Sequence, residues 1–317
     1  MAERHELPTV VFVAGASRSG STVLDIALGS NPDFVSVGEL RRLQGYARRD
    51  HELSGARSTT SELRCTCGAW VDECPLWLSV EREAGLSFRE TPFKSSGTVA
   101  CRRAVQAAYL IAGPRAAYAA AVSTRCGKRE LAVARNCFRV YDAIGAVTGS
   151  RYIVDSSKSI YHYALLRSHD ARRVRLILLA RDGRAVTHSM IRGDRATHWP
   201  AGTPPATQAA RDWARQTRSM RLLSRRTPSS EKVTLRYEEL CSDPAREFER
   251  IARMLGAPSL EPQLAPDVRH NIGGSPSRLE RHTEIRLDER WRDDLSESDL
   301  AMFERAAGAT NRRMGYC

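Results

Sequence analysis

An anion-binding loop is predicted near the N-terminus, in the run VVFVAGASRSGST from Val10 to Thr22. Its apolar, β-branched residues predict a strand, its Gly- and Ser-rich turn a loop, and the following LDIALGS the start of a helix. A helix N-terminus exposes unpaired N–H groups and the positive end of the helix dipole. The loop that leads into it is therefore expected to bind an anion.

The spacing of Gly15 and Gly20 is that of the nucleotide P-loop, G-x-x-x-x-G-K-[ST], but Ser21 holds the lysine position. Glycine suits such a loop because no side chain obstructs a positive φ or a close approach to the anion. The positive charge of the loop comes from Arg18 instead. The candidate ligands are Gly15, Ala16, Ser17, Arg18, Ser19, Gly20, Ser21 and Thr22.

Three more apolar runs predict strands, at Tyr152–Val154, Val174–Ala180 and Lys232–Leu235, and each precedes a helical segment. This alternation favours an α/β fold with a mainly parallel sheet flanked by helices, in which the very apolar run 174–180 is central. Ligands of open α/β sheets bind beyond the carboxyl ends of the strands. The residues that follow the four runs are therefore expected to converge.

Charged and hydroxyl side chains follow these runs. Lys158 comes after the second, Arg181 after the third with Ser189 eight positions on, and Tyr237 after the fourth. Arg181 and Ser189 could contact one anion through charge-assisted and hydroxyl hydrogen bonds. Three of them have a structural alternative. Lys158 could be a solvated lysine beside a helix cap, Arg181 could pair with Asp182 or a neighbouring acid, and Tyr237 could be an aromatic core residue.

The composition favours an anionic partner, since 49 Lys and Arg against 37 Asp and Glu give the 317 residues a formal net charge of +12. The basic residues are scattered, which argues against nucleic acid. The N-terminal residues lack the long apolar region of an export signal, so we expect a cytoplasmic protein. Gly113, Pro114 and Arg115 interrupt the weakly polar stretch Ala104–Val122, which predicts two helices rather than a membrane span.

Three of the eight cysteines cluster in CTCGAWVDECPLW, as Cys65, Cys67 and Cys74. Zinc usually takes four ligands, and this run offers a C-x-C pair and no clear fourth ligand unless His51 supplies it. Structural packing or a redox-sensitive pair is therefore favoured over zinc, and no metal site is expected.

Two motifs in order resemble the sulfotransferase family that uses 3′-phosphoadenosine 5′-phosphosulfate (PAPS). GASRSGSTVLDIALGSNPDFVSVGEL, residues 15–40, is similar to the 5′-phosphosulfate loop of bacterial, tyrosylprotein and glycan-modifying members. LILLARDGRAVTHSMIR, residues 176–192, is similar to the 3′-phosphate motif, a strand followed by an arginine and then a serine eight positions on. VDSSK, LRYEEL and HNIGGSPSR, at 154–158, 235–240 and 270–278, are supporting matches. They span most of the chain, so one domain over residues 1–317 is expected.

The resemblance implies a P-loop NTPase-like three-layer sandwich and sulfuryl transfer that needs no metal, which accounts for the missing P-loop lysine. It implies that the loop with Arg18 binds the 5′-phosphosulfate and that Arg181, Ser189 and Arg278 bind the 3′-phosphate. Lys158 is the candidate for neutralising the bridging oxygen or the sulfuryl group. Tyr237 is expected to contact the nucleotide. A P-loop kinase with Asp155 as a Mg²⁺ ligand is the alternative, and a nucleic-acid binder is a weaker one.

The acceptor hydroxyl needs a general base. Glu39 in Val37–Leu40 resembles the Gly-Glu segment that supplies the base in the tyrosylprotein and mycobacterial-type branches. The alternatives are a surface Glu39 paired with Arg41 or Arg42, and a histidine base from His5, His51, His162, His188 or His198.

The acceptor side is assigned to the helical segment 52–147 and to the Trp- and Pro-containing segment 193–207, because variable chemistry sits on loops over a rigid scaffold. The alanine-rich stretch 100–122 favours an apolar wall. We therefore expect a small-molecule, glycolipid or natural-product acceptor with a hydroxyl.

Overall fold

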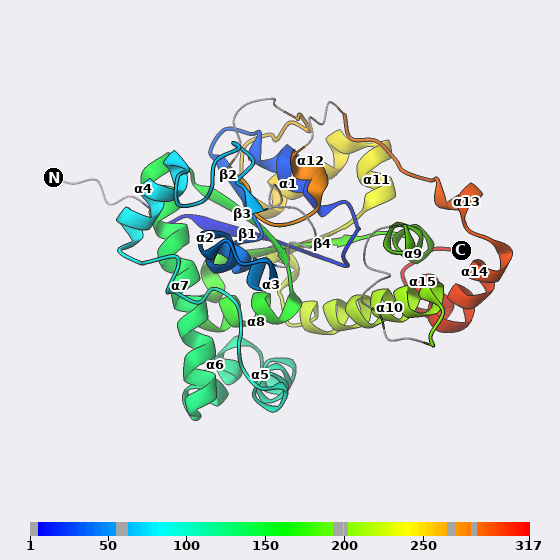
Figure 1. Ribbon diagram of the computed structural model, residues 1–317, viewed down its shortest axis with the longest axis horizontal. Helices are drawn as coiled ribbons and strands as arrows, with labels where there is room; N and C mark the ends of the chain where they lie inside the picture. Colours follow the sequence, from blue (N-terminus) through cyan, green and yellow to red (C-terminus); the bar gives the residue numbers. More distant parts are fainter. Residues whose placement is uncertain (1–5, 55–62, 193–198, 200–201, 265–269, 280–283) are drawn as a thin grey trace.

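The computed structural model describes residues 6–54, 63–192, 199, 202–264, 270–279 and 284–317. Within them, five strands form one all-parallel sheet in the order β2-β3-β1-β4-β5. Figure 1 shows these strands crossing the middle of the molecule, with helices on both faces. The strands are β1 (Thr9–Gly15), β2 (Phe34–Gly38), β3 (Tyr152–Lys158), β4 (Val174–Ala180) and β5 (Lys232–Arg236).

Alternate residues of β1 enter two separate hydrophobic cores, as the period of two of a β-strand requires. Val10 and Phe12 pack into a core with α7, α8, α9 and α10, whereas Val11 and Val13 pack with α1, α11 and α12. This is a three-layer α/β/α sandwich. The helices named here are α1 (Ser21–Gly29), α7 (Arg125–Thr148), α8 (Ile160–His169), α9 (Gly183–Ile191), α10 (Pro205–Ser224), α11 (Tyr237–Ser242) and α12 (Pro244–Leu255).

The α/β class and the parallel sheet are confirmed, but two predictions about the strands are wrong. The central strand is β1, and β4 lies between β1 and β5. Because β1 and β4 are both almost wholly buried, their apolar content could not show which of them lies at the centre of the sheet. The sequence analysis also missed β2, a five-residue edge strand whose apolar run is interrupted by Ser36.

Between β2 and β3 the described residues form helices joined by turns and irregular segments. The elements are the 3₁₀ turn η1 (Leu40–Arg42), α2 (Leu43–Arg48), α3 (His51–Ser54), α4 (Pro75–Ala84), α5 (Val99–Ala112), α6 (Pro114–Val122) and α7. The predicted pair of helices in 104–122 is confirmed: α5 ends at Ala112, Gly113 caps it with φ 81°, and Pro114 opens α6. Among the described residues, no helix is long and apolar enough to span a membrane.

The segment after α12 returns to the edge of the sheet. Ile272 pairs with Gly38 at the end of β2, where the Glu39 amide donates to the Ile272 carbonyl at 2.7 Å. This brings residues 270–279 beside the carboxyl end of β2. The remaining elements are the 3₁₀ turns η3 (Ala171–Arg173), η5 (Ser229–Glu231) and η6 (Pro276–Leu279), the helices α13 (Trp291–Asp294), α14 (Glu297–Phe303) and α15 (Ala309–Arg313), and the π-helical turn η7 (Glu304–Gly308).

Candidate functional site

A cavity of about 710 Å³ lies at the carboxyl edge of the sheet. Its walls come from the segments that follow all five strands, and from α5, α10 and residues 274–275. The convergence expected for a parallel sheet is thus observed. The predicted site residues that line it are Gly15, Ser17, Arg18, Gly20, Ser21, Thr22, Glu39, Lys158, Arg181, Ser189 and Tyr237.

The loop between β1 and α1 turns sharply at two residues. Arg18 has φ 71° and Gly20 has φ 87°, in the left-handed region that glycine adopts without strain. A Cβ atom on Gly20 would lie 2.4 Å from Cδ2 of Tyr237, so the loop packs directly on that ring. No side chain caps α1, and its N-terminus with Ser21 and Thr22 faces the cavity. This is the geometry of an anion site.

Two predicted ligands of the loop lie behind it. Ala16 and Ser19 are each 1% exposed and line a small separate pocket against Trp213 of α10. The Ser19 amide donates to the Ala16 carbonyl at 3.2 Å, which closes the turn. In this structure these two residues therefore shape the loop and do not line the large cavity.

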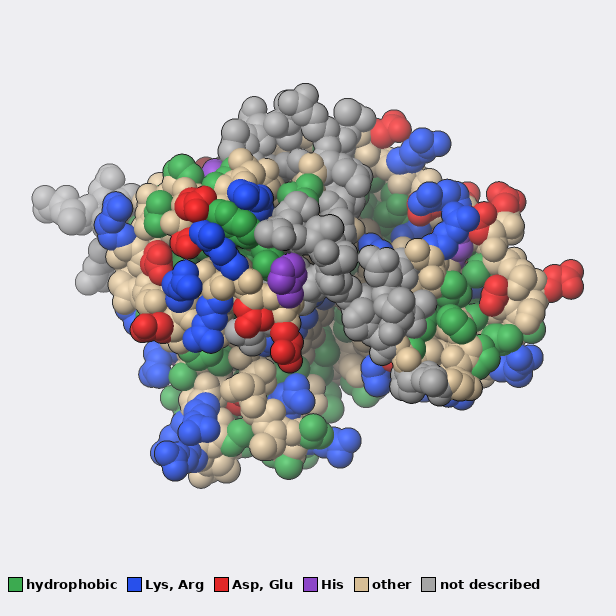
Figure 2. Space-filling model, viewed as in Figure 1, with side chains coloured by type: hydrophobic (Ala, Val, Ile, Leu, Met, Phe, Trp, Pro, Cys, Tyr) green, Lys and Arg blue, Asp and Glu red, His purple; other side chains and the backbone are tan. Residues whose placement is uncertain are grey.

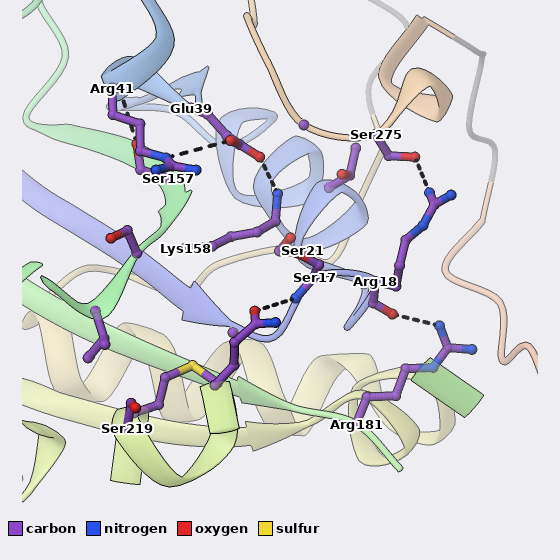
Figure 3. A pocket seen from close by; sticks show the side chains of 18 of the residues that line it. Ser17, Arg18, Ser21, Glu39, Arg41, Ser157, Lys158, Arg181, Ser219 and Ser275 are labelled. Atoms are coloured by element: carbon purple, nitrogen blue, oxygen red, sulfur yellow. Dashed lines mark hydrogen bonds and ion pairs between the residues drawn. The ribbon is translucent and has the colours of Figure 1, made fainter. Parts of the chain in front are cut away.

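Arg18 and Arg181 are linked through the loop backbone. Arg181 Nη1 donates to the Arg18 carbonyl at 3.0 Å, and Arg18 Nη1 donates to Ser275 Oγ at 3.2 Å (Figure 3). The Arg181 guanidinium also stacks on the Tyr237 ring, 4.3 Å from its centroid. Arg181 pairs with Asp288, 3.6 Å away, and not with Asp182, which caps α9. The cations are thus held by backbone and aromatic contacts at the cavity wall.

Ser189 lies on α9, two turns after Arg181, and lines the same cavity. Arg278 is placed differently. It is 3% exposed, and its guanidinium donates to the carbonyls of Ser275 and Arg64 at 3.4 Å each, so its side chain is not part of the cavity lining. The structure therefore brings together two of the three residues predicted for the 3′-phosphate.

Glu39 and Lys158 face each other from neighbouring strands. Lys158 Nζ donates to Glu39 Oε1 at 2.6 Å (Figure 3). Arg42 Nε donates to Glu39 Oε2. Arg41 Nε lies 3.9 Å from the same Oε2. Glu39 does pair with Arg42, as the alternative interpretation held, but it is only 2% exposed and is not a surface carboxylate.

The charges around Glu39 decide its ionisation. Burial alone would raise its pKa, but the positive charges of Lys158, Arg42 and Arg41 outweigh burial and hold the pKa of Glu39 well below its usual range. Glu39 is therefore an anion at neutral pH. It can accept a hydrogen bond or a proton, and it has no proton to donate.

The histidine alternatives lie elsewhere, or outside the described residues. His162 is buried against Phe12 and Cys137, and burial followed by the charge of Arg41 lowers its pKa to about 3. His188 Nε2 bonds to Asp294 at 2.9 Å, and His51 is exposed on α3. None of these three lines the cavity. His5, His198 and most of segment 193–201 lie outside the described residues.

Asp155, the possible Mg²⁺ ligand of the kinase alternative, is wholly buried and does not line the cavity. Its carboxylate accepts from the Tyr141 hydroxyl at 2.5 Å and from the Ser157 amide at 2.8 Å. The group therefore braces the end of β3 below Lys158.

Sequence analysis missed part of the cavity wall. Arg215, Gln216 and Ser219 line the cavity from little more than one turn of α10, and Gln216 Oε1 accepts from the Ser17 amide at 3.4 Å. Gln106 of α5 also lines the cavity, a polar residue where an apolar wall was expected. No motif marked these residues, because a helix can present any polar side chain of one face to a neighbouring site.

The visible surface offers no single basic patch. Figure 2 shows Lys and Arg side chains spread over this face among Asp and Glu side chains. Many arginines pair with carboxylates, for example Arg49 with Asp72 at 3.0 Å and Arg253 with Glu249 at 2.7 Å. The excess positive charge is thus distributed over this face, which fits the scattered basic residues of the sequence.

Comparison with known proteins identifies the family. The model of the sulfotransferase family matches residues 8–262. The sulfotransferase domain from the curacin biosynthetic pathway is similar in fold, with 15% identity over 98% of this chain and 99% of that chain and a TM-score of 0.57. The sulfotransferase domain of the Synechococcus PCC 7002 olefin synthase shows 18% identity over 96% and 97% of the two chains, with a TM-score of 0.51. No curated protein sequence gave a significant match. The chain belongs to the sulfotransferase family and is an enzyme of that class.

Proposed function

We propose that this sulfotransferase moves the sulfuryl group of PAPS to a hydroxyl of a small-molecule, glycolipid or natural-product acceptor. The observation that carries the proposal is the cavity wall. It joins an uncapped helix N-terminus, Arg18, the Glu39–Lys158 pair, and Arg181 with Ser189. An anion loop with a second cation–hydroxyl pair beside it suits a donor with two separate anionic groups.

The two anionic groups of the donor are assigned to two sets of residues. The first-turn amides of α1, the hydroxyls of Ser21 and Thr22 and the Arg18 guanidinium would hold the 5′-phosphosulfate. Arg181 and Ser189 would hold the 3′-phosphate, and the Tyr237 ring packs beneath both Gly20 and Arg181. Arg278 stays a prediction, since its guanidinium here bonds carbonyls of Ser275 and Arg64.

Glu39 and Lys158 would carry out the transfer. When bound, PAPS supplies the transferable sulfuryl group: the acceptor oxygen forms a bond to sulfur, the bond to the bridging oxygen breaks, and that oxygen keeps the electron pair. Glu39 would accept the acceptor's hydroxyl proton. The Lys158 ammonium has three N–H donors, so it can serve Glu39 and the departing oxygen together.

The acceptor would enter beside α5 and α10. We assign this side to the helical segment 52–147 and to segment 193–207, within one sulfotransferase domain. Gln106 lines the same cavity as the Glu39–Lys158 pair and is suited to orient a hydroxyl-bearing substrate. Gln106 makes this wall partly polar, which suits an acceptor with polar groups beside the reacting hydroxyl.

Calorimetric titration of the purified enzyme tests the donor assignment. 3′-Phosphoadenosine 5′-phosphate should bind without Mg²⁺, and AMP, which lacks the 3′-phosphate, should bind at least about tenfold more weakly. Mg²⁺-ATP is the third ligand. Tighter binding of Mg²⁺-ATP than of the bisphosphate would contradict the proposal and favour a phosphotransferase, and equal binding of AMP and the bisphosphate would contradict the 3′-phosphate site.

A further inference from the structure

Four potential metal ligands meet outside the donor cavity. Cys65, Cys67 and Cys74 lie beside His270, and their three sulfurs and the histidine nitrogen are all within 4.8 Å of one another. The three cysteines come from the segment before α4, whereas His270 comes from the segment that returns to the sheet edge. The fourth potential ligand is therefore His270, from outside the cysteine run, and not His51.

We propose that these four residues form a structural zinc site that staples segment 65–74 to segment 270–275. Two sulfur–sulfur distances in the cluster agree with a tetrahedral site, in which ligand sulfurs with Zn–S bonds of about 2.3 Å lie about 3.8 Å apart. The Sγ atoms of Cys67 and Cys74 are 3.7 Å apart, and those of Cys74 and Cys65 are 3.8 Å apart. His270 Nδ1 lies 3.1 Å from Cys74 Sγ and 3.8 Å from Cys65 Sγ.

The donor set favours zinc. Three thiolates and one imidazole at tetrahedral spacing are typical of closed zinc sites, and oxygen-seeking ions such as Mg²⁺ or Ca²⁺ find no oxygen ligand in this cluster. Zn²⁺ binding would displace the three thiol protons to solvent and leave four protein ligands with no open position. The site would be structural, separate from the sulfuryl transfer chemistry.

Hydrogen bonds hold the two segments that carry the four potential zinc ligands. The Cys65 amide donates to the Ala69 carbonyl at 2.9 Å and the Gly68 amide to the Cys65 carbonyl at 2.9 Å, which form a tight turn around Cys67. The Trp77 indole N–H donates to the His270 carbonyl at 3.1 Å. Thr66 and Asn271 exchange two hydrogen bonds, of 2.9 and 3.2 Å. The two segments are thus aligned beside the cluster.

The position of the site connects it to the cavity. Two residues beyond His270, Ile272 pairs with Gly38 and accepts from the Glu39 amide. Gly274 and Ser275 then line the cavity, where Ser275 Oγ accepts from Arg18. A zinc ion at His270 would therefore fix the strand-like segment that holds Glu39 and Arg18 in place.

Metal analysis of the wild-type enzyme tests the proposal without reference to activity. After expression with added zinc, desalting and elemental mass spectrometry, we expect one zinc per chain. Reconstitution of the stripped enzyme with Co²⁺ should give the absorption bands of a tetrahedral, thiolate-ligated ion. In native alkylation, the half-buried Cys67 should react only after a strong chelator is added, whereas the half-buried Cys101, outside the cluster, should react in both states.

Variants sharpen the test. Cys74→Ser and His270→Ala should retain well under half of the zinc, and the matched control Cys101→Ser, outside the cluster, should retain all of it. Iron in place of zinc, a Cys67–Cys74 disulfide in freshly isolated enzyme, or full zinc content in both variants would overturn the proposal. If a variant does not fold, the wild-type measurements still decide. Donor binding is measured separately, so failure of the zinc site and failure of the proposed donor give different results.

Discussion

Glu39 Oε1 and Lys158 Nζ lie 2.6 Å apart at the carboxyl ends of two neighbouring strands. Glu39 directly follows β2, and Lys158, with φ 62°, is the last residue of β3. The parallel register pairs Gly38 with Asp155, so the sheet itself sets the distance between the two side chains. Because the carboxylate is buried among cations, the two residues should act as one unit in catalysis.

Glu39→Gln should abolish most turnover and leave donor binding intact. The amide keeps the shape of the side chain but cannot accept the acceptor's proton, so we expect kcat to fall by about 100-fold or more. The donor affinity should be unchanged or higher, since Lys158 and Arg42 lose a competing anion. Steady-state kinetics and calorimetry measure both quantities. Glu83→Gln, on the exposed face of α4, is the control, and unchanged kcat in Glu39→Gln would remove Glu39 from the mechanism.

Lys158→Met should give the residual activity a new dependence on pH. Lys158 contributes the largest of the charges that lower the pKa of Glu39, and burial opposes them. Without the ammonium, the pKa of Glu39 rises, so protonation removes the base at higher pH. We expect the kcat/KM of the variant to fall on the acid side where the wild-type profile is still flat. Lys158→Arg keeps the charge and should restore the flat profile, and a flat profile in Lys158→Met would contradict the coupling.

Asp25 should make the stability depend on pH in the opposite sense from most carboxylates. Burial is the main cause that raises its pKa to about 7, and hydrogen bonds from Ser36 only partly offset burial. The unfolded chain releases the Asp25 proton near pH 4, whereas the folded chain keeps it until about pH 7. Between these values the unfolded state binds fewer protons, so the free energy of unfolding falls as the pH rises.

Asp25→Asn has no such proton and should gain stability relative to the wild type from about pH 4 to pH 7, with a constant difference above. The gain has an upper limit of about 4 kcal/mol for a shift of about three units. Urea unfolding at several pH values measures it. Glu83→Gln should show no trend over this range, and a pH-independent difference for Asp25→Asn would show that Asp25 is ionised in the folded enzyme.

Structural features that depend on a single short segment of the chain were predicted correctly from the sequence. The β1–loop–α1 unit, the α5–α6 break at Gly113 and the placing of Arg181 and Ser189 on one cavity all follow from spacing along a single segment. The α/β class follows from the alternation of runs. These features depend on residues close together in the chain, so they can be read without knowledge of tertiary contacts.

Contacts between distant segments could not be predicted in the same way. His270 meets Cys74 across 196 positions, and Gln216 meets Ser17 across 199. The edge strand β2 is short and interrupted by Ser36, whose hydroxyl donates to the buried Asp25 at 2.5 Å. The side-chain pattern of such a strand reflects its partners in the tertiary structure, which the local sequence does not contain.

Ser189→Ala and Arg181→Ala should weaken the discrimination between 3′-phosphoadenosine 5′-phosphate and AMP. Arg181 also braces the Arg18 carbonyl, so its loss is expected to lower the affinity for both ligands as well. Ser189 makes the cleaner test, with an expected loss of about tenfold or more in discrimination for one hydrogen bond to a charged group. Ser123→Ala, at the exposed end of α6, is the control. Wild-type discrimination in both site variants would contradict the 3′-phosphate assignment.

Gly20→Ala should destabilise the protein by more than the cost of placing alanine in a left-handed backbone conformation. Gly149 has a similar positive φ, 71° against 87°, but a Cβ there meets no atom within 4 Å, whereas a Cβ on Gly20 lies 2.4 Å from the Tyr237 ring. Gly149→Ala should therefore cost only about 1 kcal/mol of stability, for the left-handed conformation. Gly20→Ala should cost more and should also weaken binding of 3′-phosphoadenosine 5′-phosphate. Thermal unfolding and calorimetry of both variants separate the two effects. Adding Tyr237→Leu to Gly20→Ala should recover part of the stability because the smaller side chain can move aside, and equal losses in the two single variants would show that the loop tolerates the contact.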